Sequence, residues 1–291
     1  MNYPSFLSPH VFPADWPLLG NIRWYGVMYL VAVVITYYFL RARIKKGTLA
    51  IPLENKGGLY DLLFFLVVGL IVGARLGFFI FYHPDAFIFY PWEIIGIHIR
   101  EGQFAYFGFD GMSYHGGMLG VIASVILFAR TFKYDFYSIA DAAAVSVPLG
   151  LFFGRMGNFL NAELYGRETT FFLGMKFPRY DAVGGFQQWL AIPAEMRPFT
   201  QPRHPSQLYE AFLEGILLFM ILFIASKMKL RRGIVFWLYI TFYGLFRFLV
   251  EFVRDPNEWR LGWLTAGMAY SFPMFLLGVG MIAFIKTRKS L

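Results

Sequence analysis

Long apolar segments separated by short polar ones run along almost the whole chain. An α-helix needs about 20 apolar residues to cross the roughly 30 Å hydrocarbon core of a bilayer. Seven segments meet or approach that length, which predicts an all-α polytopic membrane protein of about seven transmembrane helices: Trp24–Leu40, Leu59–Tyr82, Gly116–Phe128, Tyr137–Phe159, Leu208–Ala225, Gly233–Phe252 and Ala266–Ile285. The third segment is short, and it gains length if Gly108–His115 enters the membrane as irregular backbone buried in protein.

One long polar insertion interrupts this pattern. It covers residues 160–206, between the fourth and fifth apolar segments, and is called the long loop below. The other connections are short, and no internal repeat or low-complexity tract divides the chain. The sequence therefore predicts a single integral membrane domain over residues 1–291, with the long loop inserted as its one substantial part outside the membrane.

The composition agrees with a lipid environment. Hydrophobic residues make up 58% of the chain and charged residues only 15%, whereas a soluble domain is about 25% charged. The chain has no cysteine, which excludes a cysteine nucleophile, a thiolate metal site and any disulfide. The lipid bilayer is thus the expected environment, and any thiol chemistry must use the thiol of another molecule.

The net charge of +8 is distributed as topology signals. Basic residues lie in short runs beside the apolar segments, which does not favour nucleic-acid binding. Fourteen of them fall in the short segments of one side: Arg41, Arg43, Lys45, Lys46, Lys56, Arg130, Lys133, Lys227, Lys229, Arg231, Arg232, Lys286, Arg288 and Lys289. Because cytoplasmic segments carry the excess of Lys and Arg, we expect the N-terminus outside, the C-terminus in the cytoplasm and the long loop outside.

Three arginines, Arg75, Arg155 and Arg247, fall inside the predicted spans. An arginine at the bilayer centre costs about 3 kcal/mol on insertion scales, so such residues usually face a cavity. The expected topology places these arginines and the other polar groups of the spans toward the outer leaflet: Tyr25, His115, Asn158, Asn161, Glu163, His204, Glu210, Glu251 and Arg254. This distribution predicts a cleft open on one side of the membrane.

Two interpretations apply to the charged groups of the sixth span. Tyr243, Arg247, Glu251 and Arg254 recur at helical spacing and share one face, so Glu251 could simply neutralise Arg247 or Arg254 in a structural ion-pair ladder. Arg155 has no acidic neighbour in the chain before Glu163, which favours an anionic ligand as its partner. Arginine is suited to bidentate phosphate recognition.

The segment from Ser113 to Gly120 places a lone histidine, His115, before Gly116 and Gly117 at a helix start. Free N–H groups at such a start can bind an anion, although a glycine-rich membrane helix is more often a close-packing face. The five histidines of the chain show no metal-ligand spacing, and neither GxSxG nor HExxH occurs. The sequence therefore favours neither a metal site nor a serine hydrolase.

Several motifs together resemble the bacterial prolipoprotein diacylglyceryl transferases. They are Gly111-Met-Ser-Tyr-His115-Gly-Gly, Gly154-Arg-Met-Gly-Asn-Phe-Leu-Asn-Ala-Glu-Leu-Tyr-Gly166, Arg203-His-Pro-Ser-Gln-Leu-Tyr-Glu210 and Tyr243-Gly-Leu-Phe-Arg-Phe-Leu-Val-Glu-Phe-Val-Arg254. Trp24-Tyr-Gly26 and Gly73-Ala-Arg-Leu-Gly77 fit the same pattern. The motifs occur in order on six of the seven spans.

The resemblance implies a seven-span fold with an outward-facing head made largely from the long loop, in the bacterial cytoplasmic (inner) membrane. It implies phosphatidylglycerol as donor, the lipobox cysteine of a prolipoprotein signal peptide as acceptor, and no cofactor or metal. Positions on which the family relies match Tyr25, His115, Arg155, Asn158, Gly166, Tyr243 and Arg247. The sequence departs at Phe78, where tyrosine is common, and at Met268, where glutamine is common, which puts a peripheral hydrogen bond in doubt.

The catalytic candidates are then His115, Arg155, Arg247, Tyr25 and Tyr243. The candidate substrate-binding residues are Arg155, Asn158, Asn161, Glu163, Gly166, Arg247, Glu251, Gly116, Gly117, Arg75 and His204. His115 is the candidate base for the acceptor thiol, whose pKa of about 8.5 leaves it mostly protonated at neutral pH. Arg155 and Arg247 are expected to stabilise the departing phosphate oxygen.

Two other classes of function compete with this one. A transporter or flippase of an anionic lipid or solute would also need buried cations, but transporters commonly show internal repeats and a site at the midplane. A structural scaffold with buried ion pairs would leave unexplained why the polar groups gather toward one leaflet.

Overall fold

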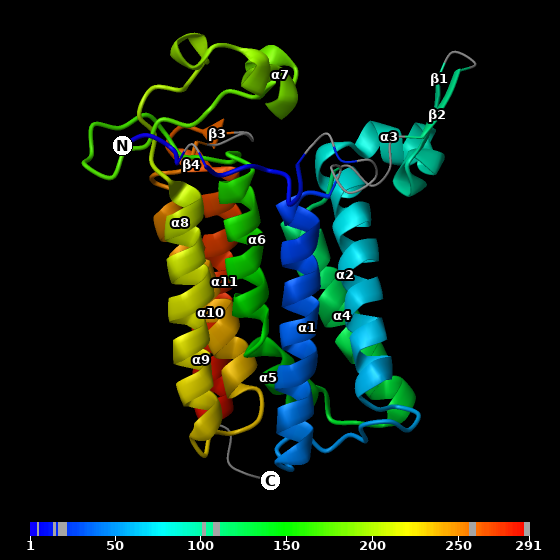
Figure 1. Ribbon diagram of the computed structural model, residues 1–291. Coiled ribbons are helices and arrows are strands. Elements are labelled where there is room, and N and C mark those ends of the chain that lie inside the picture. The colour runs from blue at the N-terminus through cyan, green and yellow to red at the C-terminus, as the bar shows by residue number, and fades with distance from the viewer. Residues whose placement is uncertain are drawn as a thin grey trace. The chain divides into compact units, whose positions relative to one another are not determined.

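The computed structural model confirms a mostly helical chain suited to a membrane (Figure 1). It describes residues 1–4, 6–13, 16, 22–100, 103–106, 111–255 and 260–287. Within these ranges six helices are long and apolar enough to cross a membrane, and the 17-residue helix Ile234–Val250 is a shorter apolar one. Part of the expected irregular segment, residues 108–110, lies outside the described residues, as do Arg288 and Lys289.

The chain forms two compact units. The smaller unit comprises Leu40–Ala140 and the larger comprises Met1–Phe39 together with Asp141–Leu291. In the smaller unit, helix α2 (Leu59–Tyr82) lies beside α4 (Tyr114–Phe132). Between them come α3 (Pro84–Phe89), the 3₁₀ helix η2 (Pro91–Ile95) and a hairpin of β1 (Ile97–Arg100) and β2 (Gln103–Tyr106), in which Ile97 pairs with Tyr106.

Glycines let α2 and α4 pack backbone to backbone. A Cβ atom added at Gly73 would lie 2.6 Å from the Cα of Gly120, and one at Gly116 would lie 2.7 Å from the Cα of Gly77. Small residues at such positions let membrane helices approach closely. Gly116 therefore has a packing role in this unit. Close packing was one of the two alternatives that the sequence left open for this glycine-rich helix start, beside anion binding.

The larger unit contains the remaining long helices. These are α1 (Trp24–Lys45, which continues into the smaller unit), α6 (Val147–Leu160), α8 (Ser206–Glu210), α9 (Leu218–Lys227), α10 (Ile234–Val250) and α11 (Ala266–Thr287). A π-helix, η5 (Ala211–Leu217), joins α8 to α9. Helices α10 and α11 lie side by side, and η5 packs against α6.

The fourth span is broken where the sequence analysis expected one continuous helix, Tyr137–Phe159. Helix α5 (Phe136–Ala144) ends before residues 145–146, and α6 then begins with Pro148 in its first turn. The proline ring removes an N–H donor and crowds the carbonyl four residues earlier, here that of Ala144, which explains the break.

A carboxylate at this break fixes the start of α10. Asp141 accepts hydrogen bonds from the backbone N–H of Gly233 at 2.7 Å and from that of Phe236 at 2.8 Å. These two N–H groups lie at the first turn of α10 and have no partner within the helix. Asp141 therefore acts as a cap supplied by a distant part of the chain.

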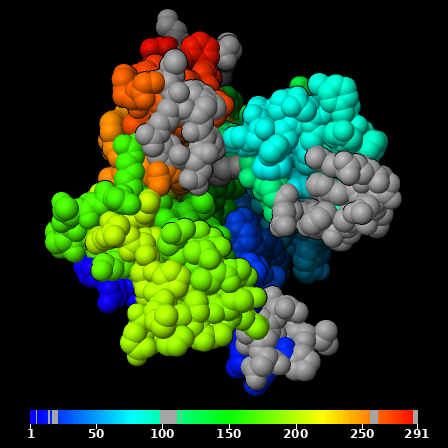
Figure 2. Space-filling view, turned by 90° about the horizontal axis from the view of Figure 1, so that it is seen from above, coloured from blue at the N-terminus to red at the C-terminus, as the bar shows by residue number. Residues whose placement is uncertain are grey.

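The long loop and the N-terminal residues of the larger unit fold together. The loop carries η3 (Asp181–Val183), α7 (Phe186–Ala191) and η4 (Ala194–Met196), and Figure 2 shows it in green to yellow. The Tyr3 ring packs on Phe159 and Phe177, and its hydroxyl donates to the carbonyls of Phe159 and Leu160 at 3.0 Å. A short hairpin of β3 (Arg260–Leu261) and β4 (Leu264–Thr265) precedes α11.

Candidate functional site

Six charged side chains from distant segments of the larger unit meet in one cluster. We call it the arginine–glutamate cluster; its members are Arg155 of α6, Glu210 of α8, Glu214 of η5, Arg247 of α10, and Glu251 and Arg254 just beyond α10. The three arginine side chains are 12–16% exposed, whereas Glu210, Glu214 and Glu251 are at most 4% exposed. The cations therefore lie at the open side of the cluster and the carboxylates behind them.

Arg155 has a partner that the sequence analysis missed. Its Nη2 lies 2.6 Å from Oε2 of Glu210 and 3.9 Å from Oε2 of Glu214. The interpretation that favoured an anionic ligand considered only neighbours in the chain, whereas Glu210 comes from the other side of the long loop. Nη1 of Arg254 also donates to Oε1 and Oε2 of Glu210, at 3.0 and 3.2 Å, so this one carboxylate binds two cations.

Arg247 is paired by charge with a carboxylate of its own helix face. Its Nη1 lies 2.6 Å from Oε2 of Glu251, one helical turn away, as the ion-pair interpretation of this face expected. Neither of these two buried atoms is aligned in a hydrogen bond among the described residues. The guanidinium is thus held beside a buried carboxylate, and the Arg247 side chain is 12% exposed.

Polar side chains at the end of α6 continue the site. Arg155 Nη1 approaches Oδ1 of Asn158 at 3.5 Å, and Nδ2 of Asn158 donates to Oε1 of Glu163 at 2.8 Å. Asn161 Nδ2 reaches the same carboxylate oxygen at 3.5 Å. Asn161 and Glu163 also line a hollow of about 740 Å³, together with Arg23, Asp181, Arg203 and Asp255. Three sequence candidates therefore form one chain of contacts that begins at Arg155.

Both tyrosine candidates interact electrostatically with Arg155. Tyr25 of α1 packs on α6, where a Cβ added at Gly157 would lie 3.1 Å from the Tyr25 ring, and its hydroxyl is 2.9 Å from that of Tyr29. It interacts electrostatically with Arg155 and Glu163. Tyr243 of α10 is 1% exposed and interacts with Arg155, Glu214 and Arg247. Both tyrosines therefore belong to the surroundings of the cluster.

Gly166 and His204 hold the long loop against the segment that follows α10. The N–H of Gly166 donates to the carbonyl of His204 at 2.8 Å, and a Cβ at Gly166 would overlap the carbonyl oxygen of Val253. Only glycine fits there. Nδ1 of His204 lies 3.3 Å from the hydroxyl of Tyr209, and burial lowers the pKa of the imidazole. These contacts fix the backbone next to Arg254, which pairs with Gly166 in a β-bridge.

The remaining candidates lie in the smaller unit. Arg75 donates to three backbone carbonyls, those of Glu93 at 2.8 Å, Ile94 at 2.7 Å and Gly111 at 3.1 Å, so it ties α2 to η2 and to the segment before α4. His115 stands in the first turn of α4. The N–H groups of Gly116 and Gly117 are already bonded to Ser113, through its Oγ at 3.2 Å and its carbonyl at 2.9 Å. These two donors are therefore occupied within the helix cap.

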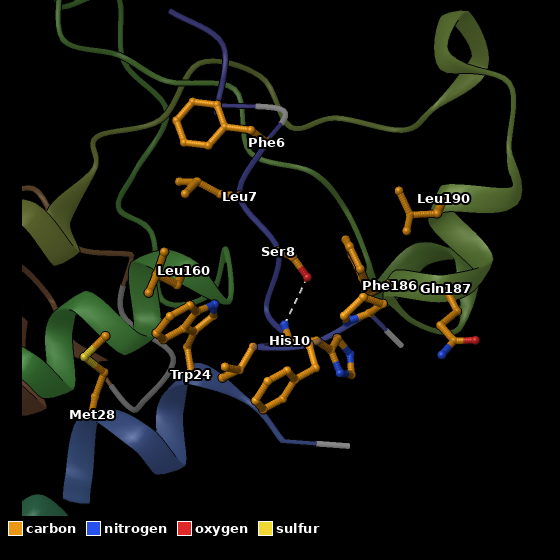
Figure 3. Close-up of a pocket in the computed structure, with 13 residues that line it drawn as sticks. Phe6, Leu7, Ser8, His10, Trp24, Met28, Leu160, Phe186, Gln187 and Leu190 are labelled. Atoms are coloured by element: carbon orange, nitrogen blue, oxygen red, sulfur yellow. Dashed lines mark hydrogen bonds between the residues drawn. The ribbon is translucent and has the colours of Figure 1, made fainter. Parts of the chain in front are cut away.

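A separate cavity of about 880 Å³ lies between the N-terminal residues, α1 and α7 (Figure 3). Trp24, Met28 and Leu160 form one wall, and Phe186 and Leu190 form another. Among the described residues, its lining includes no arginine, lysine or carboxylate. The cavity therefore lacks the charge needed for phosphate, and the arginine–glutamate cluster is the better candidate for anion chemistry.

Six candidate spans and a cluster of buried ionic side chains define a multi-pass membrane protein. The sequence profile described as prolipoprotein diacylglyceryl transferase matches residues 16–284, and the chain belongs to that family. The chain is 40% identical to the phosphatidylglycerol–prolipoprotein diacylglyceryl transferase of Geobacter sulfurreducens over 97% of its own length and 98% of that relative. For the same enzyme of Chlorobaculum tepidum the identity is 39%, over 98% and 92%. The resemblance seen in the motifs is confirmed, and the chain is a transferase.

Proposed function

We propose that the protein transfers the diacylglyceryl group of phosphatidylglycerol to the thiol of the lipobox cysteine in a prolipoprotein signal peptide, the first step of lipoprotein maturation. Membership of the family supports this reaction. The proposal includes a place in the bacterial inner membrane, an outside N-terminus, a cytoplasmic C-terminus and an active site toward the outer leaflet, as the distribution of Lys and Arg predicts.

The arginine–glutamate cluster is the proposed phosphate site. Arg155 and Arg247 come from two different helices, and their side chains are 16% and 12% exposed, whereas the carboxylates that pair with them are at most 4% exposed. This partial exposure of two cations in front of buried carboxylates is the observation that carries the assignment. Asn158, Asn161 and Glu163 are proposed to bind the donor lipid beside Arg155, and Glu251 to hold Arg247 in place.

The bond changes balance without a cofactor. The acceptor sulfur forms a bond to the glyceryl carbon that carries the phosphate ester, and the bond from that carbon to the phosphate oxygen breaks. The thiol proton passes to His115 as general base, because the thiolate and not the thiol is the nucleophile. Glycerol phosphate leaves with the bonding electron pair, and Arg155 and Arg247 stabilise the charge that grows on its oxygen.

The other candidates have supporting roles in this proposal. Tyr25 and Tyr243 border Arg155 and are proposed to orient the phosphate near it. Gly166 and His204 position the backbone beside Arg254. Arg75 is proposed to position the segment that leads into α4, and thereby His115, because its bonds go to the backbone on both sides of the β1–β2 hairpin. Gly116 and Gly117 support the same helix start.

The experiment that tests the proposal uses purified protein, phosphatidylglycerol and a synthetic signal peptide with a lipobox cysteine. Mass spectrometry should find the mass of one diacylglyceryl group on the cysteine and free glycerol phosphate in equal amount. A peptide with serine in place of cysteine is the control and should gain no mass. If the lipid crosses the bilayer in vesicles while the peptide stays unmodified, the protein is a flippase and the proposal is wrong.

A further inference from the structure

Glu214 is the member of the arginine–glutamate cluster with both carboxylate oxygens buried and without a hydrogen bond among the described residues, and its ion-pair contact is longer than those of Glu210 and Glu251. Its side chain is 0% exposed, and both Oε1 and Oε2 are buried without a donor. Arg155 is near, but Nη2 stands 3.9 Å from Glu214 and 2.6 Å from Glu210. Glu210 and Glu214 thus face the same arginine, and only Glu210 is bonded.

The groups around Glu214 come from each helix packed on it. Arg155 comes from α6, Glu210 from α8, Tyr243 and Arg247 from α10, and Arg254 from the turn after α10. Helix α9, which continues from η5, carries one charged residue, Lys227, which lies in its last turn. At the residue that follows Glu214, a Cβ added at Gly215 would lie 2.7 Å from the Cβ of Phe152, so η5 and α6 approach closely at this point.

The charges of the cluster decide which form of Glu214 suits a phosphate. Three arginines face three glutamates, so the cluster is neutral when all are ionised. A bound phosphodiester would then bring a further negative charge into a poorly solvated site, which is unfavourable. It would also place that charge near the ionised Glu214 carboxylate, which has no hydrogen bond among the described residues, and the repulsion between the two charges is unfavourable too. With Glu214 neutral the cluster keeps one positive charge, which matches the single charge of the phosphodiester.

We propose that Glu214 is protonated in the state that binds the donor lipid, and that its neutral carboxyl group leaves Arg155 and Arg247 one positive charge in excess for the phosphate. This inference rests on the proposed function and assigns Glu214 as a positioning residue that acts through Arg155. The π-helix is consistent with it, since π-helical turns within α-helices occur often at functional sites.

The first test is the KM for phosphatidylglycerol measured against pH in detergent micelles. The wild-type KM should rise as pH rises through the titration of Glu214, by about tenfold per pH unit where the carboxylate is ionised. In Glu214→Gln, whose amide resembles the protonated carboxyl but has no proton to lose, KM should be independent of pH over the same range. The same pH dependence in both proteins would overturn the inference.

A matched control separates charge from folding. Glu210→Gln makes the same chemical change four residues earlier, but it removes a carboxylate that holds Arg155 and Arg254. It should lower the melting temperature, whereas Glu214→Gln should not, because Glu214 has no hydrogen bond to lose. Glu214→Asp keeps a group that titrates and should retain a pH-dependent KM.

A second measurement needs only the wild type and reports protonation directly. Infrared difference spectra on addition of phosphatidylglycerol should contain a C=O stretch that shifts in D₂O, as that of a protonated carboxyl group does and those of the lipid esters do not, and Glu214→Gln should lack it. The absence of this band in the wild type with lipid bound would overturn the inference even if the variant failed to fold. If wild-type protein binds the lipid and shows the band but transfers nothing to the peptide, the proposed function fails and the protonation of Glu214 stands.

Discussion

Arg155 and Glu210 form an ion pair of 2.6 Å between α6 and α8, across the whole long loop. Because Glu210 also binds Arg254, this single carboxylate joins the end of the fourth span to the end of the sixth. Arg155, one of the two side chains proposed to bind phosphate, is therefore also one of the side chains that hold three helix ends together. Variants of the cluster must be examined for folding as well as for turnover.

Lysine substitutions test the phosphate assignment of Arg155 and Arg247. Arg155→Lys and Arg247→Lys keep the charge but lose the planar fork that binds phosphate through two N–H groups. Each should lower turnover about tenfold or more, which corresponds to roughly 1.4 kcal/mol of transition-state stabilisation. Turnover near that of the wild type in both variants would leave the arginines as structural cations.

Alanine at Arg247 tests its second role. Arg247→Ala leaves Glu251, which is 3% exposed, without its partner in the preceding turn, whereas Arg247→Lys retains a cation. The alanine variant should lose about 1–3 kcal/mol of stability, the cost of an unpaired buried polar group. Melting in detergent measures this directly. Equal melting temperatures for the Ala and Lys variants would show that the pair does not stabilise the fold.

The role of His115 is tested by pH. His115→Gln should reduce turnover more at neutral than at alkaline pH, because the acceptor thiol ionises without a base as the pH approaches its own pKa of about 8.5. The ratio of wild-type to variant turnover, measured from neutral to alkaline pH, should fall. A ratio that stays constant would indicate a structural or substrate-positioning role.

The topology is tested with single cysteines, since the chain has none of its own. Lys45→Cys and Lys229→Cys should resist a membrane-impermeant thiol reagent in intact cells, because both belong to the basic segments assigned to the cytoplasm. Glu195→Cys, at an exposed position of the long loop, is the positive control and should react. Reaction at position 45 or 229 in intact cells would reverse the proposed orientation.

Two glycine-to-alanine variants in the larger unit provide a matched test of how stability depends on the space around each glycine. Gly166→Ala forces a methyl group against the carbonyl of Val253 and should cost about 1–3 kcal/mol. Gly154→Ala meets nothing within 4 Å and replaces a glycine inside α6 by a better helix former, so it should be neutral or stabilising. Thermal melts of the two variants decide this. Equal melting temperatures would mean that the loop at Gly166 relaxes freely.

Most of the helical framework could be predicted because hydropathy is a local property of the sequence. The ends of α2 match the expected second span, and α11 extends the expected seventh span only from Ile285 to Thr287. The break before α6 was missed although Pro148 was visible, because apolar residues continue on both sides of it. The contribution of Tyr3 to the long-loop core was also missed, since a single aromatic residue carries no signal of its distant partners.

The site could be predicted only where its residues lie close together in the chain. The face shared by Arg247 and Glu251 follows from helical spacing, and their pairing was among the expected alternatives. The partners of Arg155 required knowledge of which helices touch. A signal did exist: Glu210 and Glu214 are carboxylates four residues apart within or beside an apolar span, where the cost of burial implies cationic partners.

The π-helix at Ala211–Leu217 has a consequence for insertions and deletions in this part of the chain. A π-helical turn amounts to one extra residue accommodated within an α-helix. Deleting one apolar residue there would restore regular α-helical winding and would leave the turns on either side in nearly the same rotational phase. Glu210 would then stay close to Arg155 and Arg254. The same deletion within the regular winding of α9 would instead rotate everything before it by about 100° and would move Glu210 away from both arginines. The π-helix therefore gives this part of the chain a tolerance of one residue that the regular helices around the site lack.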